Sequence, residues 1–194
     1  MPRPVWSIIL LVVISVIFFV QQFVPYEKFE FVPAAASANP WTFVTAIFLH
    51  ASPTHLFYNM LALFFLGPSL ESRIGSRRFL ILFFLAGIFG SLGYMLTAGD
   101  STIPALGASG AIFGIIGALA VIAPLSVVYV TLYPMPMILF AVLYGALAVL
   151  GLFGPETGIA NGAHVGGLIF GVFYGFYLRR KIFPQPIKLT ARKV

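Results

Sequence analysis

Four polar residues stand in otherwise apolar stretches of this sequence, and their types could assemble a catalytic site. They are His55, Asn59, Ser109 and His164. A serine hydroxyl is a weak nucleophile unless a neighbouring base takes its proton, and an imidazole can do so near neutral pH. Ser109 with His164 as its general base would therefore attack acyl carbons.

Attack on a peptide carbonyl creates an oxyanion, which needs hydrogen-bond donors. The candidate donors are the Ser109 backbone N–H, the Asn59 side-chain amide and the His55 imidazole. Asp100 and Glu156 fall in predicted loops and not in the apolar stretches, so we expect no carboxylate beside these residues. The catalytic group would then be a Ser–His dyad and not a triad.

Other catalytic chemistries lack the residues that they need. The chain contains no cysteine, which excludes thiolate nucleophiles, thiolate metal sites and disulfides. A His-Glu-x-x-His zinc motif is absent, and Asp100 is the single aspartate, whereas an aspartyl mechanism needs two. His50 and His55 are five residues apart and point to different faces of a helix. We therefore expect neither a metal nor an organic cofactor.

The composition places these residues in a lipid bilayer. Of the 194 residues, 60% are hydrophobic and 8% are charged, whereas soluble domains carry about 25% charged residues. The mean hydropathy is +1.04. On a soluble protein, a net charge of +6 would suggest nucleic-acid binding. Here the basic residues are too sparse and too close to the ends of the chain to form such a binding surface. The expected partner is the membrane, with no nucleic acid.

Gaps between charged residues predict six transmembrane helices. The uncharged stretches within 3–27, 78–100 and 156–179 each hold one helix of roughly 20 residues, the length that a bilayer core of about 30 Å requires. Residues 31–70 begin with loop composition and leave room for one span at their end. Residues 101–155 accommodate two spans, divided by prolines near positions 124 and 134–136.

The expected fold class is therefore all-α. We expect one six-helix membrane domain over residues 1–194, with a core at 40–180 and a short basic tail at 181–194. Ala36-Ser37-Ala38 resembles a signal-peptide cleavage site but lies too far beyond the first apolar run, so we expect this span to be retained.

Basic residues predict the orientation of the six spans. Both termini share one side, and ten of the eleven Lys and Arg residues then lie on it, with only Lys28 opposite. Arg73, Arg77 and Arg78 fall in the predicted loop between the second and third spans. Lys and Arg concentrate in cytoplasmic segments, so both termini should be cytoplasmic. The default location is a prokaryotic plasma membrane, with the polar residues near its extracytoplasmic face.

This topology brings the polar residues to a common depth. The second, fourth and sixth helices all enter from outside and carry His55, Asn59, Ser109 and His164 in their first turns. At a rise of 1.5 Å per residue, these residues should lie within about 10 Å of the outer surface. A buried polar group is costly in a bilayer unless it is paired, so the four residues are expected to share a pocket.

Small residues at four-residue spacing predict close packing of the fourth and sixth helices. One stripe is Gly110, Gly114 and Ala118, and the other is Ala163, Gly167, Gly171 and Gly175. Such stripes let helices approach closely, which would bring Ser109 and His164 within hydrogen-bond reach. Phe113 follows Ser109 by one turn on the same face and is a candidate to pack on the His164 ring.

These residues resemble motifs of the rhomboid family of intramembrane serine proteases. The matching segments are His55-Leu-Phe-Tyr-Asn59, Gly107-Ala-Ser109-Gly110, Ala163-His164-Val-Gly-Gly167-Leu-Ile-Phe-Gly171 and Glu71-Ser-Arg73-Ile-Gly75. The likeness covers roughly residues 40–180. It implies that Ser109 is the nucleophile and His164 the general base, and that His55 and Asn59 help to form the oxyanion hole. Gly107, Gly110, Phe113 and Gly167 would support this site.

The resemblance also implies the substrates. Members of this family cleave transmembrane segments of other proteins near their outer end, at small residues in helices that unwind easily. Their first outer loop lies partly in the membrane interface, which Phe29, Phe31, Trp41 and Phe43 would suit.

Two positions depart from the family pattern. Trp41-Thr42 replaces a frequent Trp-Arg pair, which puts the usual arginine contacts of the loop in doubt. Phe113 replaces a frequent tyrosine, which keeps an aromatic face but removes a hydroxyl.

Two other classes of function compete with proteolysis. A catalytically silent rhomboid-like protein would bind membrane clients without cleaving them, and the reactivity of Ser109 separates the two. A small transporter or channel would need a polar path across the whole membrane. The inner halves of the second, fourth and sixth helices are apolar, which disfavours that class.

Overall fold

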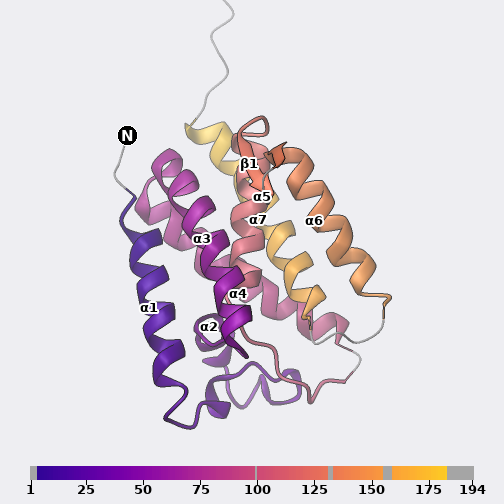
Figure 1. The fold of residues 1–194 in the computed structure, drawn as a ribbon. Coiled ribbons are helices and arrows are strands. Elements are labelled where there is room, and N and C mark those ends of the chain that lie inside the picture. Colours follow the sequence, from indigo (N-terminus) through magenta and orange to yellow (C-terminus); the bar gives the residue numbers. More distant parts are fainter. Residues whose placement is uncertain (1–3, 99, 131–132, 155–158, 183–194) are drawn as a thin grey trace, which may run out of the picture.

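The computed structural model describes residues 4–98, 100–130, 133–154 and 159–182. Six helices of 14 to 22 residues form most of this part of the chain (Figure 1). They are α1 (Trp6–Val20), α3 (Pro53–Ile74), α4 (Ser76–Thr97), α5 (Ser109–Ile122), α6 (Met137–Gly151) and α7 (Asn161–Ile182). The chain is mostly helical, and these six helices lie where the charge gaps predict them.

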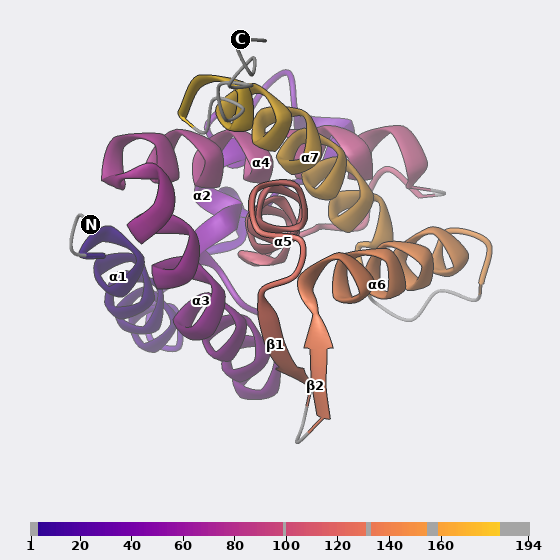
Figure 2. The ribbon, with the colours of Figure 1, turned by 90° about the horizontal axis from the view of Figure 1, so that it is seen from above.

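Helix α5, the shortest of the six, lies at the centre of the bundle, and the other five helices surround it (Figure 2). Every residue from 110 to 121 is buried. This segment contains only Gly, Ala, Val, Leu, Ile and Phe, so no face of α5 needs contact with a polar environment.

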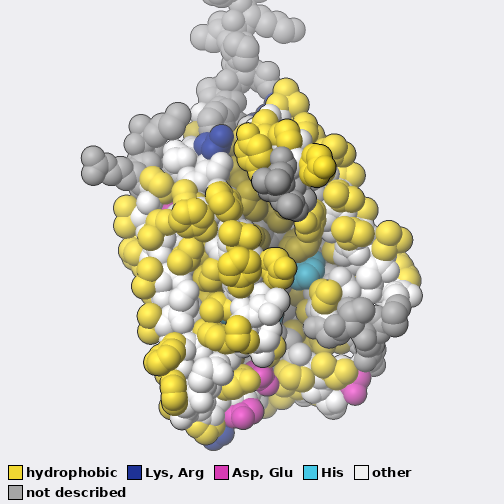
Figure 3. All heavy atoms as spheres, viewed as in Figure 1, with side chains coloured by type: hydrophobic (Ala, Val, Ile, Leu, Met, Phe, Trp, Pro, Cys, Tyr) yellow, Lys and Arg dark blue, Asp and Glu magenta, His cyan; other side chains and the backbone are white. Residues whose placement is uncertain are grey.

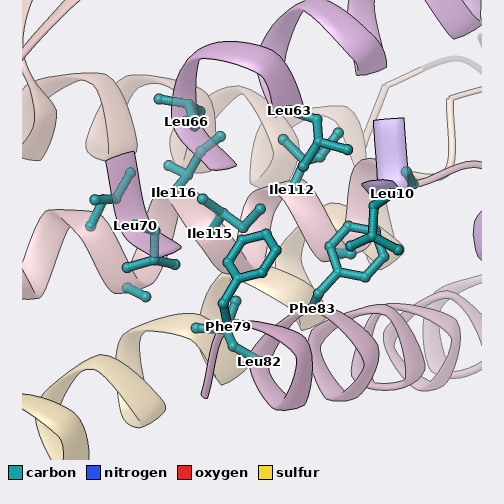
Figure 4. Close-up of a cluster of buried hydrophobic side chains, with 14 of the residues drawn as sticks. Leu10, Leu63, Leu66, Leu70, Phe79, Leu82, Phe83, Ile112, Ile115 and Ile116 are labelled. Carbon is teal, nitrogen blue, oxygen red and sulfur yellow. The ribbon is translucent and has the colours of Figure 1, made fainter. Parts of the chain in front are cut away.

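One apolar cluster joins α5 to its neighbours (Figure 4). It includes Leu10 of α1, Leu63, Leu66 and Leu70 of α3, Phe79, Leu82 and Phe83 of α4, and Ile112, Ile115 and Ile116 of α5. The leucines of α3 recur at spacings of three and four, which places them on one face of that helix. The cluster therefore holds the helix that begins at Ser109 against three others.

The connection between α1 and α3 is largely irregular, as its alanine- and proline-rich sequence predicts. It contains the short helix α2 (Thr42–Thr45) and the 3₁₀ turns η1 (Glu27–Phe29), η2 (Pro33–Ala35) and η3 (Ala46–Phe48). Phe29 and Trp41 are exposed. Phe31 instead is fully buried and packs on Phe43, with ring centroids 4.7 Å apart.

The buried position of Phe31 differs from the position in the membrane interface that the family resemblance implies. Backbone hydrogen bonds explain it, because Phe31 and Ala105 exchange two bonds of 3.1 and 2.8 Å. These bonds attach the connection between α1 and α3 to the segment that leads into α5.

The mostly helical chain fits the expected all-α class, but one connection contains a hairpin that the sequence did not predict. Strands β1 (Val127–Val130) and β2 (Tyr133–Pro136) pair antiparallel between α5 and α6, with Val127 opposite Pro136. Valine and tyrosine favour strands, and proline disfavours a helix interior. The prolines therefore mark the helix break correctly, while the residues around them form a hairpin.

The predicted loop that carries Arg73, Arg77 and Arg78 is also wrong. Arg73 lies in the last turn of α3, and Arg77 and Arg78 lie in the first turn of α4. Gly75 alone separates the two helices, with φ +81° and ψ 154°. The charged residues mark the end of the apolar segments, but both helices continue past that point because one glycine is enough to reverse the chain.

The predicted tail has a similar correction. Helix α7 continues to Ile182, so Lys181 is helical and the tail does not begin there. The rest of the tail, residues 183–194, lies outside the described residues, as do Arg3 and Glu156.

The outer surface is widely hydrophobic (Figure 3). Acidic side chains gather at the lower end of the face in that view, at the end where α1 leads into its irregular connection. Exposed apolar surface of this extent marks contact with lipid or protein.

The described chain begins and ends at the same end of the bundle (Figure 1). Among the described helices, α4 alone is both long and apolar enough by itself to cross a membrane. Helices α1, α5 and α6 are apolar but have only 14 or 15 residues. The number of crossings and the side of the termini therefore stay predictions.

Candidate active site

Ser109 is the first residue of α5, at the end of a segment held by backbone hydrogen bonds. Gly107 donates its N–H to the Ala46 carbonyl over 2.9 Å and has φ +121°. That backbone conformation is strained for residues with a Cβ, so glycine suits the turn into the helix. The turn presents the Ser109 hydroxyl at the helix end, where the first N–H groups have no partner within the helix.

His164 reaches this hydroxyl from α7. Its Nε2 lies 2.9 Å from Ser109 Oγ, a normal hydrogen-bond distance. The Phe113 ring stacks on the imidazole, with centroids 4.3 Å apart and planes 4° apart. Fifty-five residues separate the two partners in the sequence, so the packing of α5 on α7 sets their distance.

Glycine on both helices makes that packing possible. A Cβ added at Gly167 would collide with the Gly110 carbonyl oxygen, and one at Gly171 would collide with that of Gly114. A Cβ at Gly175 would lie 3.0 Å from the Ala118 Cα, a closer contact than side chains normally make. The two small-residue stripes therefore face each other as predicted, and the backbones of α5 and α7 are in direct contact.

His55 lies beside the turn that precedes Ser109. Ser52 caps α3 by accepting a hydrogen bond from the His55 N–H over 3.1 Å. A Cβ at Gly107 would lie 2.8 Å from His55 Nε2, so glycine at this position also makes room for the imidazole. The His55 ring thereby contacts the segment that positions Ser109.

Asn59 is buried one turn further along α3. Its Nδ2 donates to the His55 carbonyl over 2.9 Å, which leaves the second N–H of the amide for another acceptor. The hydrogen bonds of the described residues do not join Asn59 or His55 directly to Ser109. The structure thus brings these two residues to the site on α3, while Ser109 and His164 make the direct contact.

A small cavity lies next to Ser109. Its volume is about 30 Å³, and its lining includes Gly107, Ser109 and Ala163. A water needs about 10–15 Å³ of such space, so the cavity has room for one or two water molecules.

Helix α5, which begins at Ser109, is short. Its 14 residues at 1.5 Å per residue span about 21 Å, less than a bilayer core of about 30 Å.

Sequence reasoning missed the contacts of His50. This residue is fully buried, and its Nε2 lies 3.5 Å from the Ala108 N–H, directly before Ser109. The Gln21 side chain holds the His50 backbone with two hydrogen bonds, of 2.7 and 3.2 Å. A glutamine at the end of the first apolar run was the available signal. His50 thereby joins α1 to the loop that leads into α5.

Glu71 is a second residue whose role the sequence did not reveal. Its carboxylate is fully buried and accepts hydrogen bonds from the backbone N–H groups of Val5, Trp6 and Ser7 and from the hydroxyls of Ser7 and Ser76. It therefore caps α1 from the end of α3. Among the described residues, no group of three His, Cys, Asp or Glu side chains could hold a metal ion.

Comparison with known proteins identifies the family. A family model described as "Rhomboid domain" matches residues 37–181. The chain is 38% identical over 142 residues to rhomboid protease GluP of Bacillus subtilis (71% of this chain, 26% of the relative). It is 34% identical over 163 residues to rhomboid-like protease 3 of Toxoplasma gondii (80% and 58%).

Rhomboid protease GlpG of Yersinia pseudotuberculosis is 30% identical over 140 residues, which is 71% of this chain and 48% of the relative. The chain thus spans between a quarter and three fifths of the length of these three relatives. The match includes α3, α5 and α7, the helices that carry His55, Ser109 and His164. This protein therefore belongs to the rhomboid family of integral membrane proteins.

Proposed function

We propose that this protein is an intramembrane serine endopeptidase that cleaves transmembrane segments of other membrane proteins near their outer end. The observation that carries the proposal is the 2.9 Å contact between His164 Nε2 and Ser109 Oγ. A hydroxyl and an imidazole at this distance form a nucleophile with its base. The protease names of the relatives support the same reaction class.

The first half of the reaction acylates Ser109. Its Oγ attacks the peptide carbonyl carbon while His164 Nε2 takes the hydroxyl proton, which gives a tetrahedral oxyanion. His164 then gives this proton to the leaving amine as the C–N bond breaks. The carboxyl half of the cleaved bond stays on Ser109 as an ester.

A water completes the reaction. His164 takes a proton from it, the resulting hydroxide attacks the ester carbonyl, and the proton returns to Ser109 Oγ as the acid product leaves. The cavity beside Ser109 has room for such a water, and Ser109, which lines it, lies 2.9 Å from His164 Nε2.

Three groups are proposed to stabilise the oxyanion. The Ser109 N–H is at the start of α5, where the helix dipole also favours negative charge. Asn59 has a second amide N–H beyond the one that bonds the His55 carbonyl. The His55 imidazole lies against Gly107, two residues before Ser109. Removal of one such donor typically lowers kcat by about 10²–10³-fold, which is the effect expected for Asn59→Ala.

We also propose six membrane crossings with both termini in the cytoplasm, in a cell membrane of prokaryotic type. The shared end of the described termini and the basic residues there support this orientation. A cytoplasmic-type signal from a reporter fused after Val194 would agree with it, and an extracytoplasmic signal would contradict it.

The test of the catalytic proposal is cleavage of labelled single-span substrates in liposomes. Wild type should cleave, while Ser109→Ala and His164→Ala should fall to the level of empty liposomes. Ser126→Ala is the matched control, because its hydroxyl bonds the Ala123 carbonyl at the far end of α5. Cleavage by Ser109→Ala would reject the proposed nucleophile.

A fluorophosphonate probe covers the case in which no tested substrate is cleaved. Labelling of wild type and Ser126→Ala but not of Ser109→Ala would support an activated serine independently of substrate choice. A wild type that stays unlabelled would favour the client-binding alternative.

A further inference from the structure

A second cavity opens at the opposite end of the bundle from Ser109. It lies between the first turn of α4 and the last turns of α7, and its volume is about 490 Å³. Its lining includes Ser76, Arg77, Arg78, Tyr174, Tyr177 and Lys181. Cavities of this size commonly hold small molecules or cofactor groups.

The contacts between α4 and α7 change along the two helices toward this cavity. At the Ser109 end, glycines bring them together: a Cβ at Gly93 would lie only 3.1 Å from the Gly166 Cα. Further along, Phe89 stacks on Phe170 with ring centroids 4.8 Å apart. The residues at the contact between α4 and α7 thus change from glycine near Ser109 to phenylalanine further along. The two helices lie side by side on one flank of the bundle (Figure 2).

Three cations surround the cavity, and its lining contains no Asp or Glu. Glu71, which is hydrogen-bonded to Ser76, is the carboxylate that borders it. That carboxylate is fully buried and accepts its hydrogen bonds from backbone amides and serine hydroxyls, not from these cations. The positive charge of Arg77, Arg78 and Lys181 therefore remains for an outside anion.

Weak contacts hold two of the cations in place. Arg78 donates from Nη1 to the Ile74 carbonyl over 3.2 Å, which leaves four of its five N–H donors. Lys181 Nζ lies 4.9 Å from the centre of the Tyr177 ring. Tyr177 and Tyr174 are stacked with centroids 5.8 Å apart. The cavity therefore combines positive charge with free donors, a combination that suits phosphate.

Exposed apolar side chains continue from the cavity along both helices. Ile81 lines the cavity, and Leu85 follows it by one turn of α4. Phe173 is exposed one turn before Tyr177 on α7. A ligand with a phosphate in the cavity would thus have hydrocarbon-compatible surface directly beside it.

We propose that this cavity binds the phosphate group of an anionic glycerophospholipid, with its acyl chains along α4 and α7. The combination of cations and exposed apolar residues favours a lipid over a soluble phosphate. Anionic lipids are enriched in the cytoplasmic leaflet, on the side where Lys and Arg concentrate. This site is separate from Ser109, so its occupation does not depend on proteolysis.

The test is native mass spectrometry of the full chain, released from detergent that contains equal amounts of phosphatidylglycerol and phosphatidylcholine. Wild type should retain phosphatidylglycerol preferentially. The double variant Arg77→Gln/Arg78→Gln should bind it at least about tenfold more weakly, because each charge-assisted hydrogen bond contributes about that factor. Arg180→Gln is the control outside the cavity lining, and it is matched in charge and position to the cavity variant Lys181→Gln, since each removes one positive charge from the last turn of α7.

Four results would overturn the proposal. Wild type could retain both lipids equally, or Arg180→Gln could weaken binding as much as the double variant, which would mean a diffuse effect of charge. Free inorganic phosphate at the lipid concentration could displace the lipid, which would indicate a site for a soluble anion. Lys181→Gln provides the second cavity variant should the double variant fail to fold, and undiminished lipid retention by it would also reject the site.

Discussion

The Phe113 ring lies parallel to the His164 imidazole, with centroids 4.3 Å apart and planes 4° apart. In Ser–His–Asp enzymes a carboxylate orients the base through a hydrogen bond. Here the hydrogen bonds of the described residues give His164 no carboxylate partner, and its Nε2 faces Ser109 Oγ. The stacked ring is therefore the contact that fixes the imidazole plane.

Phe113→Leu tests this role. Leucine keeps an apolar side chain at the position but lacks a flat face, so the imidazole gains freedom to tilt away from Ser109. We expect kcat to fall by about 10–100-fold with little change in KM, because misplacement of a catalytic group by about 1 Å can cost about 10²-fold.

Phe140→Leu is the control for the loss of an aromatic pair, since Phe140 packs on Tyr144 at 4.4 Å on α6. It should retain the wild-type kcat. An unchanged kcat in Phe113→Leu would show that other contacts orient His164.

Gly107→Ala should inactivate the protein as well as destabilise it. Alanine would be strained at φ +121°, and its Cβ would lie 2.7 Å from His55 Cε1. The backbone strain costs about 1–3 kcal/mol. Displacement of His55 and of the turn before Ser109 should in addition lower kcat by about 10²-fold or more.

Gly75→Ala separates the two effects. Gly75 also has a positive φ, +81°, but nothing lies within 4 Å of the position of its missing Cβ. This variant should lose thermal stability without a comparable loss of kcat. Equal losses of kcat in both variants would mean that stability, and not the place of His55, limits the reaction.

The positions of the helices could be predicted from the sequence because charge is so costly in a bilayer. The gaps between charged residues mark the six long helices, and the opposed stripes predict the contact of Gly110 with Gly167. The residues at which helices begin and end were less predictable. Arg73 and Arg77 lie inside helices because a single Gly75 reverses the chain.

The residues that support the site could not be predicted from local patterns. Glu71 caps the start of α1, 64 to 66 residues away, by accepting hydrogen bonds from backbone N–H groups, which every residue except proline has and which therefore leave no mark in the sequence. His50 likewise contacts the backbone of Ala108. The catalytic candidates were recognisable because polar side chains in apolar helices are rare, whereas these two act through the folded backbone.

Glu71→Ala should destabilise the protein by about 3 kcal/mol or more. The variant removes the acceptor for the backbone N–H groups of Val5, Trp6 and Ser7, and a bond to a charged acceptor contributes about 1.5–3 kcal/mol. Hydrogen exchange should accelerate at the start of α1 before other helices are affected. Glu27→Ala, at an exposed glutamate, should change stability by about 0.5 kcal/mol or less.

Hydrogen–deuterium exchange by mass spectrometry, together with thermal unfolding in detergent, measures both expectations. Uniform acceleration over all helices would contradict a local role of Glu71 at the start of α1. If Glu71→Ala keeps the wild-type stability, water replaces the Glu71 carboxylate oxygens as hydrogen-bond acceptors with no loss in the free energy of unfolding.

Gly171→Ala tests whether the contact between α5 and α7 sets the distance between Ser109 and His164. The added methyl would collide with the Gly114 carbonyl oxygen, which belongs to the backbone and cannot rotate away. The helices must then separate, which costs about 1–3 kcal/mol as other overpacked cores do. His164 lies two turns before Gly171 on the same face of α7, so separation moves it from Ser109 and should lower kcat by about 10²-fold.

Gly145→Ala adds the same methyl where it can be accommodated. Its Cβ would meet Leu168 Cδ2 at 2.7 Å, the end of a side chain that can change rotamer. This variant should retain kcat and lose less stability than Gly171→Ala, as measured by thermal unfolding and substrate cleavage in the same liposomes. If Gly171→Ala keeps the wild-type kcat, the pair of Ser109 and His164 tolerates separation of the helices, and the glycines contribute to stability alone.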